Sequence, residues 1–489
     1  MQSAFSTLDW IVFASYFGLL ALTSFILSRK EITSSREYFL GSNSMPMFAV
    51  AISVLATSQS AATFLGAPEF SYAYDFTFIG FYISALFAVI FISFVLIPKF
   101  YEMRAVTVYE LLEIRYGESA KKQAGVMFLV GRTLASGARL YIGALAVSMI
   151  LFNDILFLHV ALSVFTLLLG ALAYTYFGGV RSVILSDVIQ ALTYIGAGIA
   201  VLIFLYYSLQ DTEILSALQE HDKLKFLDTS VEGKFSIISL LGGWLLLNIA
   251  AFGLDQDMAQ RVLTCKNKNE AVKSLILSIL LTIPVVMLFL TIGALLFLFY
   301  MQSDISQNFE GERVTIFMYY ILNEMPEGLR GLVPVGAVAA ALSSTNSVLG
   351  AMASVAVEDI YKPWKLKHSK VQEAHFIKAS RIAVLFFALI LGIMAMVSYF
   401  WQRYMDTSLV SFALGVMAFA YTGLLGVYFS ALFTSRGNST TVFFALVGGF
   451  LSVLAMQPYS FGIDIGFSWQ IVIGTIIAFG FMQLGSNNF

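Results

Sequence analysis

Charged residues and cysteine are both scarce in this chain of 489 residues. Only 12% of the residues are charged and 59% are hydrophobic, whereas a soluble domain has about 25% charged residues. So few charges cannot cover a water-exposed surface, and we therefore expect an all-α polytopic membrane protein. The net charge of -2 argues against nucleic-acid binding. The single cysteine, Cys265, cannot form an internal disulfide.

Catalytic signatures are lacking as well. The sequence has no Walker loop, no nucleophile elbow, no Ser/His/Asp arrangement and no cluster with metal-ligand spacing. We therefore expect no enzyme activity and no cofactor. An intramembrane enzyme would show convergent nucleophiles or metal ligands within its spans, and none appear.

Long apolar runs are abundant. A helical crossing of the bilayer needs about 20 mostly apolar residues. Thirteen windows qualify: 9–28, 46–66, 77–98, 123–151, 155–177, 186–208, 235–254, 274–301, 331–355, 377–400, 408–433, 441–456 and 466–484. No linker divides the chain, so we expect a single transmembrane domain whose odd number of spans places the termini on opposite sides.

The basic residues of the loops predict the orientation. With the N-terminus outside, twenty Lys and Arg residues fall in inner loops, and Cys265 also lies inside. The outer loops then hold only six, which are Lys223, Lys225, Lys234, Arg313, Arg330 and Arg403. Because basic residues concentrate in cytoplasmic loops, we predict that the N-terminus is outside and the C-terminus inside.

Polar side chains interrupt the window at 46–66. Residues 53–68 (SVLATSQSAATFLGAP) place six hydroxyl or amide side chains at mid-membrane depth. They could form a packing face between helices. They could instead mark a discontinuous helix whose unwound carbonyls bind a cation.

The window at 331–355 carries a second polar cluster. Ala340, Ser343, Ser344 and Ser347 follow helical spacing and share one face. Neutral oxygens of this kind suit a hard cation. The alternative is that the serines bond to carbonyls of their own helix.

Three charged side chains within the predicted windows are candidates for a functional role. A carboxylate there is costly unless it is paired, so Asp187 is either part of a functional site or the partner of Arg181. Arg132 could bind a substrate carboxylate, reach the inner interface, or hold Asp187 or another acid. Arg139 lies seven residues further along and has no assigned role.

Several separated motifs together resemble the sodium/solute symporter family, which includes sodium-coupled sugar, sialic acid and vitamin carriers. The matching stretches are residues 35–41 (SREYFLG), 56–60 (ATSQS) with Phe64 and Pro68, Gly178 and Gly179 with 186–190 (SDVIQ), Asn248 with 255–261 (DQDMAQR), and 340–347 (AALSSTNS) with 359–361 (DIY). The resemblance spans about residues 8–435. Beyond it, residues 437–440 (GNST) depart from the family pattern.

The resemblance implies a LeuT-like 5+5 inverted-repeat core within about 13 transmembrane helices. Residues 1–45 would form a leading helix and inner loop. Residues 46–208 and 235–433 would form the two inverted repeats, and residues 434–489 two C-terminal helices. The two interrupted or polar spans predicted above agree with such a core.

The resemblance also implies two sodium sites. The principal site would use carbonyls of Ala56, Gln59 and Ala340 with hydroxyls of Ser343 and Ser344. A second site, present in part of the family, would use Asp187, Ser343, Asn346 and Ser347, with an amide at 346 in place of a hydroxyl.

A substrate site beside the sodium ions would be lined by Ser58, Ser60, Thr63, Phe81, Arg132, Asn248 and Phe252. Here the sequence departs from the sugar carriers, because Phe81 replaces a polar residue, Ala251 an aromatic gate residue, and residues 416–420 (VMAFA) a glutamine-rich stretch. A sugar would find few hydrogen bonds in such a pocket. We therefore expect a less polar or carboxylate-bearing substrate, with Arg132 as its candidate anchor.

The implied function is sodium-coupled symport of a small organic solute into the cell by alternating access. The implied location is the plasma membrane, the cytoplasmic membrane of a bacterium, with no obligate protein partner. Two alternatives remain at this point. Asp187 could carry a proton in a proton-coupled symporter, or the fold could serve as a membrane sensor or channel that does not transport solute.

Overall fold

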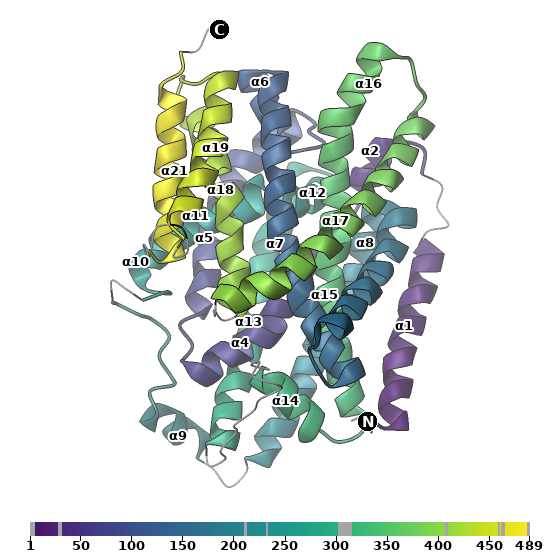
Figure 1. Ribbon diagram of the computed structural model, residues 1–489, viewed down its shortest axis with the longest axis vertical. Coiled ribbons are helices and arrows are strands. Elements are labelled where there is room, and N and C mark those ends of the chain that lie inside the picture. Colours follow the sequence, from purple (N-terminus) through teal and green to yellow (C-terminus); the bar gives the residue numbers. More distant parts are fainter. Residues whose placement is uncertain are drawn as a thin grey trace.

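The computed structural model describes residues 5–27, 32–209, 213–230, 233–301, 315–405, 409–457, 460 and 465–486. Throughout these ranges the chain is helical apart from loops and two isolated β-bridges. The helices form a bundle whose long members run roughly along the long axis of the molecule (Figure 1).

The helices of the first half are α1 (Thr7–Leu27), α2 (Ser35–Leu40), α3 (Met47–Ser58), α4 (Ala61–Ala73), α5 (Ile79–Glu102), α6 (Glu110–Tyr116), α7 (Glu118–Phe152), α8 (Phe157–Ser208) and α9 (Ile214–Glu220). The seventh predicted span is a composite of α10 (Ile237–Ser239), η2 (Leu240–Trp244), α11 (Leu245–Ile249) and η3 (Ala250–Leu254). The helices that follow are α12 (Gln256–Leu263), α13 (Lys268–Tyr300), α14 (Ile316–Asn323), α15 (Leu329–Ser354), η4 (Val355–Tyr361), α16 (Lys362–His368), α17 (Glu373–Met405), α18 (Leu409–Phe433), α19 (Ser439–Ala455) and α21 (Phe467–Gln483).

Each predicted window falls on a helix of this set. Among the described residues, eight helices are long and apolar enough to cross a membrane, or nine when the bent pair α3 and α4 is taken as one span. The count of thirteen is not confirmed, because α8 covers two windows in one helix and α1, α19 and α21 have shorter apolar stretches.

The predicted inner and outer loops lie at opposite ends of the molecule. Helices α2, α6 and α16, which belong to predicted inner loops, lie near the end at which α21 finishes (Figure 1). Helices α9 and α14, from predicted outer loops, lie at the other end with the start of α1. Arg29, Lys30 and Arg313 of the predicted loops lie outside the described residues.

The polar window at 46–66 is a broken helix. Helices α3 and α4 meet at an angle of 60°, and the two residues between them, Gln59 and Ser60, have extended backbones. The far end of α4 is held from the loop after α9, where Lys223 Nζ donates a hydrogen bond to the Tyr72 carbonyl at 2.6 Å. Burial lowers the pKa of Lys223 below its ordinary value.

Helix α8 changes direction at Gly179. This residue has φ 57° and ψ -159°, a conformation that only glycine adopts readily. A Cβ at this position would lie 2.5 Å from the Tyr38 carbonyl oxygen of α2. The glycine therefore permits both the break within α8 and the close approach of α2.

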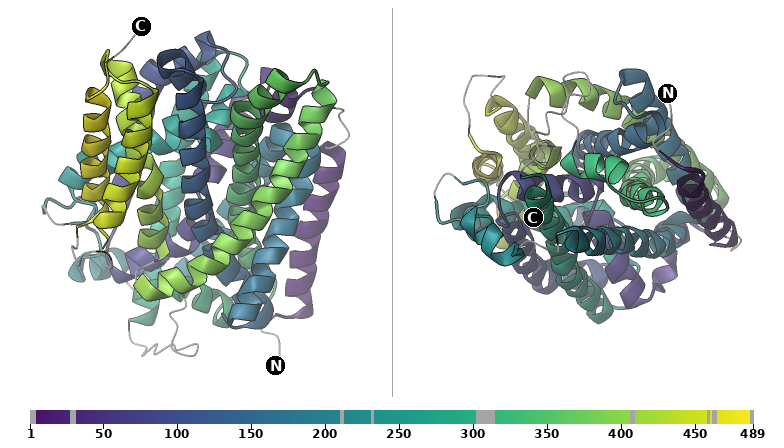
Figure 2. Two further views of the ribbon diagram at one scale, coloured as in Figure 1. Left: turned by 45° about the horizontal axis from the view of Figure 1, so that its top comes forward. Right: turned by 90° about the horizontal axis from the view of Figure 1, so that it is seen from below.

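Helix α15 lies in the centre of the bundle. It packs along α8 and also contacts α3, α4 and α7, and 89% of its apolar window is buried against 39% for α8 and α17. The view along the long axis shows helices surrounding this part of the chain (Figure 2). The polar face of α15 is consequently presented to other helices rather than to lipid.

Candidate functional site

The break between α3 and α4 brings two predicted features together. The carbonyls of Ala56 and Gln59 lie on the last turn of α3 and at the break, where regular helical bonding ends. Helix α15, which contacts both α3 and α4, carries Ala340, Ser343 and Ser344. The elements expected to form the principal sodium site are thus neighbours, and the assignment of a sodium ion to these oxygens stays a prediction.

Two polar side chains near the break have no bonded partner. The hydroxyl of Thr57 and both amide atoms of Gln59 are buried, and none makes a hydrogen bond within the described part of the chain. Such groups are costly to bury unsatisfied. They are therefore free to bind a polar ligand or ion, and that role stays a prediction.

The hydroxyl groups of α15 divide into two kinds. Ser344 and Ser347 donate to carbonyls of their own helix, Ser344 to Ala341 at 3.1 Å and Ser347 to Ser344 at 2.9 Å. The Ser343 hydroxyl instead donates to Asp187 Oδ1 on α8 at 2.9 Å. The back-bonding alternative therefore describes part of this face, while Ser343 connects it to the buried acid.

Asp187 is completely buried. Besides Ser343, its carboxylate accepts hydrogen bonds from Ser53 of α3 at 2.5 Å and from Arg261 of α12 at 3.2 Å. The predicted structural partner of Asp187, Arg181, is exposed, and Arg261 takes that place. The acid therefore joins three elements, α3, α12 and α15, to α8.

Arg132 is bound to two acids at the start of α12. Its Nε lies 2.8 Å from Asp255 Oδ2, and its Nη2 lies 3.3 Å from Asp257 Oδ2. Asp255 also accepts hydrogen bonds from its neighbour's backbone, Asp257 N–H, and from the hydroxyl of Tyr421. Arg132 therefore pairs with acids of the protein, which is one of the three roles that the sequence left open.

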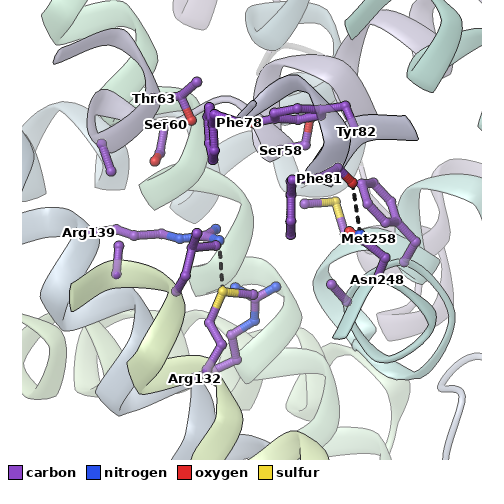
Figure 3. A pocket seen from close by; sticks show the side chains of 16 residues that line it. Ser58, Ser60, Thr63, Phe78, Phe81, Tyr82, Arg132, Arg139, Asn248 and Met258 are labelled. Carbon is purple, nitrogen blue, oxygen red and sulfur yellow. Dashed lines mark hydrogen bonds between the residues drawn. The ribbon is translucent and has the colours of Figure 1, made fainter. Parts of the chain in front are cut away.

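A cavity lies between the broken helix, α5, α7, η3 and α18 (Figure 3). All seven side chains expected at the substrate site line it, namely Ser58, Ser60, Thr63, Phe81, Arg132, Asn248 and Phe252. The Asn248 amide donates to the Phe81 carbonyl at 3.1 Å, which joins α11 to α5 at the cavity wall.

Several lining residues were not expected from the sequence. They are Ala62, Phe78, Tyr82, Arg139, Met258, Ala413 and Leu414, whereas Ala251 and Met417 lie at positions where the sequence departs from the sugar carriers. Arg139 is the notable one, because its Nη2 contacts only the Met417 sulfur, at 3.2 Å (Figure 3), and no carboxylate of the described residues lies within ion-pair distance of it. Its seven-residue spacing from Arg132 is the signal that could have placed it on the same cavity.

Comparisons with known proteins give a consistent result. A sequence profile described as the sodium:solute symporter family matches residues 38–449. A sodium/sialic acid symporter of Proteus mirabilis is 27% identical over 483 residues, covering 96% of this chain and 93% of that protein. The mouse sodium-coupled monocarboxylate transporter 1 is 26% identical over 460 residues, covering 91% and 72% respectively. The family and both relatives are transporters.

Solved structures confirm the expected fold class. A sodium-coupled sialic acid symporter in a substrate-bound outward-open state matches with a TM-score of 0.84 and 24% identity, over 98% of this chain and 97% of the other. The nucleobase-cation-symport-1 family transporter Mhp1 matches with a TM-score of 0.54 and 13% identity, over 94% and 96%. These likenesses establish the LeuT-like fold. With the profile match over most of its length, this chain belongs to the sodium:solute symporter family and is a sodium-coupled symporter of the membrane.

Proposed function

We propose that this symporter carries a small monocarboxylate with a mainly apolar body into the cell together with sodium. The observation that carries the proposal is the contrast between the two arginines on the cavity wall. Arg132 already binds Asp255 and Asp257, whereas the guanidinium of Arg139 donates to the Met417 sulfur and forms no ion pair with the described residues. A guanidinium in a low-dielectric cavity favours an anion, and a carboxylate fits it in bidentate geometry.

In this proposal Arg139 is the anchor and Arg132 supports it. The substrate remains a carboxylate, as the sequence analysis expects. Its anchor is Arg139, which lies seven residues after Arg132 on α7. Arg132 contributes by fixing the start of α12, which carries Met258 of the cavity wall.

The remaining lining supports the apolar body. Phe78, Phe81, Phe252 and Met417 line the cavity along with smaller apolar side chains, and the hydroxyls of Ser58, Ser60 and Thr63 come from the broken helix (Figure 3). An apolar wall holds a substrate by burial and rejects polar groups that lose their hydrogen bonds. The relatives named as sialic acid and monocarboxylate transporters share a carboxylate substrate, and this cavity favours the less hydroxylated one.

The principal sodium ion would bind at the carbonyls of Ala56, Gln59 and Ala340 with the hydroxyls of Ser343 and Ser344. In this arrangement the ion links the first predicted repeat (46–208), which contains the α3–α4 break, to the second (235–433), which contains α15. Sodium and solute then favour the same outward-facing state, which is the condition for coupling.

The driving force suffices for accumulation. One charge crossing 100 mV supplies about 2.3 kcal/mol, and a tenfold sodium gradient adds about 1.4 kcal/mol. Transport would proceed by alternating access in the plasma membrane, the cytoplasmic membrane of a bacterium, with the N-terminus outside and the C-terminus inside.

A ligand panel tests the substrate class. Purified protein is heated with butyrate, benzoate, N-acetylneuraminate, glucose or the neutral butyramide, each in sodium or in potassium and at two pH values. We expect butyrate or benzoate to raise the melting temperature in sodium only, because a bound ligand stabilises by mass action. Stabilisation by glucose or butyramide instead would contradict a carboxylate substrate, and stabilisation that ignores sodium but follows pH would favour proton coupling through Asp187.

A further inference from the structure

The second predicted sodium site already contains a cation of the protein. Asp187 is its only charged member, and both carboxylate oxygens are engaged. Oδ1 accepts from Ser343, and Oδ2 accepts from Ser53 and from Arg261 Nη2 at 3.2 Å. The Asp187 side chain is fully buried and that of Arg261 is only 3% exposed.

Arg261 is fixed in this position by three further hydrogen bonds. Its Nη1 donates to the Asp257 carboxylate at 2.8 Å and to the Asp257 carbonyl at 2.6 Å. Its Nε donates to the Ser53 hydroxyl at 2.9 Å. A guanidinium does not lose its proton in proteins, so a permanent positive charge stands beside Asp187.

The other members of the predicted second site do not converge on Asp187. The Ser347 hydroxyl donates to a carbonyl of its own helix at 2.9 Å. The backbone carbonyl of Asn346 accepts from Thr175 at 2.9 Å, and its buried amide makes no hydrogen bond to any described residue. A sodium ion here would have to share a single carboxylate with Arg261, and the two positive charges would repel each other.

The charges of the ion-pair chain are consistent with a single ion. Asp187, Arg261, Asp257, Arg132 and Asp255 are linked in that order by buried pairs. Three carboxylates and two guanidiniums leave one negative charge. One sodium ion bound at Ser343, which already contacts Asp187, balances these five residues, and a second ion would add positive charge to an interior that also holds the guanidinium of Arg139.

We infer that Arg261 takes the position that a second sodium ion would need, so that this chain binds one sodium ion rather than two. The inference rests on the principal sodium site of the proposed function. It concerns ion number alone and holds whichever solute is carried.

The test counts ions bound to the purified full-length chain without any organic solute. Equilibrium binding of radioactive sodium should give one ion per wild-type molecule and a Hill coefficient of one. Arg261→Gln should raise the count to two, with a Hill coefficient above one. In the double variant Arg261→Gln with Asp187→Asn the count should return to one, because the freed carboxylate is removed again.

Two matched variants separate the charge from the ligand set. Arg261→Lys keeps a positive charge and should still bind one ion. Asn346→Ser restores a hydroxyl to the predicted second site while Arg261 remains, and it should also bind one ion. If Asn346→Ser alone bound two ions, the amide rather than Arg261 would exclude the second ion, and the inference would be wrong.

The wild-type count decides the matter even if Arg261→Gln does not fold. Two ions bound to the wild type would overturn the inference and leave the principal site intact. No ion bound to the wild type would instead overturn the principal site and the inference with it. The two failures are therefore distinguishable in one measurement.

Discussion

At the residue scale, two arginines on one helix have different roles because their surroundings differ. Arg139→Gln should weaken carboxylate binding by about 1.5–3 kcal/mol, or roughly 10- to 100-fold, which is typical for the loss of a charged hydrogen bond. The measurement is sodium-dependent uptake of the carboxylate found in the ligand panel, as a function of its concentration in proteoliposomes. Arg139→Lys, which keeps the charge but not the bidentate geometry, should show an intermediate loss. An unchanged apparent affinity in Arg139→Gln would exclude this residue as the anchor.

The matching substitution at Arg132 should mainly lower the stability of the fold. Arg132→Gln leaves the buried Asp255 and Asp257 without this partner, and breaking a buried ion pair costs about 3–5 kcal/mol. We expect a markedly lower melting temperature in detergent. Arg139→Gln serves as the control, because no described carboxylate pairs with it. Equal melting temperatures for the two variants would show that the pairs of Arg132 do not stabilise the fold.

The serines of α15 offer a similar contrast. Sodium should stabilise the wild type against heating by RT ln(1 + [Na⁺]/Kd), about 2.7 kcal/mol at 100 times the dissociation constant. Ser344→Ala should reduce this stabilisation, since it removes an oxygen of the principal site. Ser347→Ala should retain it, because Ser347 is not among the predicted ligands of the principal site. The measurement is the shift in melting temperature between sodium and potassium. A full sodium shift in Ser344→Ala would remove this residue from the site.

At the scale of single elements, the break in α8 depends on one glycine. Gly179→Ala should destabilise the protein by about 1–3 kcal/mol because the left-handed backbone becomes strained, and the new Cβ would also meet the Tyr38 carbonyl. Gly196→Ala is the control on the same helix, where an added Cβ has nothing within 4 Å. Melting temperatures of the two variants compare the effects, and an equal effect would mean that the break tolerates other residues.

Short polar elements are harder to predict than long apolar ones. Hydropathy located the long spans, and clustered hydroxyls located the break between α3 and α4, because both signals lie within one segment of sequence. Helix α12 falls in a predicted inner loop, since its eight residues include one acid and one arginine and follow a second acid, Asp255. It is nevertheless buried over its whole length, because its charges pair with residues of α7 and α8.

At the scale of the whole molecule, the arrangement of basic loops predicts the orientation. The structure places the two sets of loops at opposite ends (Figure 1), and labelling can show which end faces the cytoplasm. In a Cys265→Ala background, Lys225→Cys and Lys367→Cys each put one cysteine at an exposed position of an opposite end. A membrane-impermeant maleimide added to intact cells should label Lys225→Cys only. Labelling of Lys367→Cys alone would reverse the proposed orientation.

The sequence by itself determined the membrane environment, the positions of the spans and the residues that gather at the cavity. The first two follow from local composition, and the third follows from the resemblance of separated motifs to the sodium/solute symporter family. Seven residues expected at one site, drawn from four separate predicted spans, line one cavity. The family resemblance was the signal for all seven, and the polar cluster of the broken helix and the charge of Arg132 also marked four of them.

Only the tertiary structure decided how the buried charges pair. Arg132 meets Asp255 across 123 positions of sequence, and Arg261 meets Asp187 across 74. No pattern along the chain distinguishes Arg132 from Arg139, because the charge of an arginine in the membrane is balanced by whichever acid the packing of other helices brings near. The pairing in turn leaves Arg139 facing the cavity and places Arg261 beside Asp187, which is the basis of both proposals.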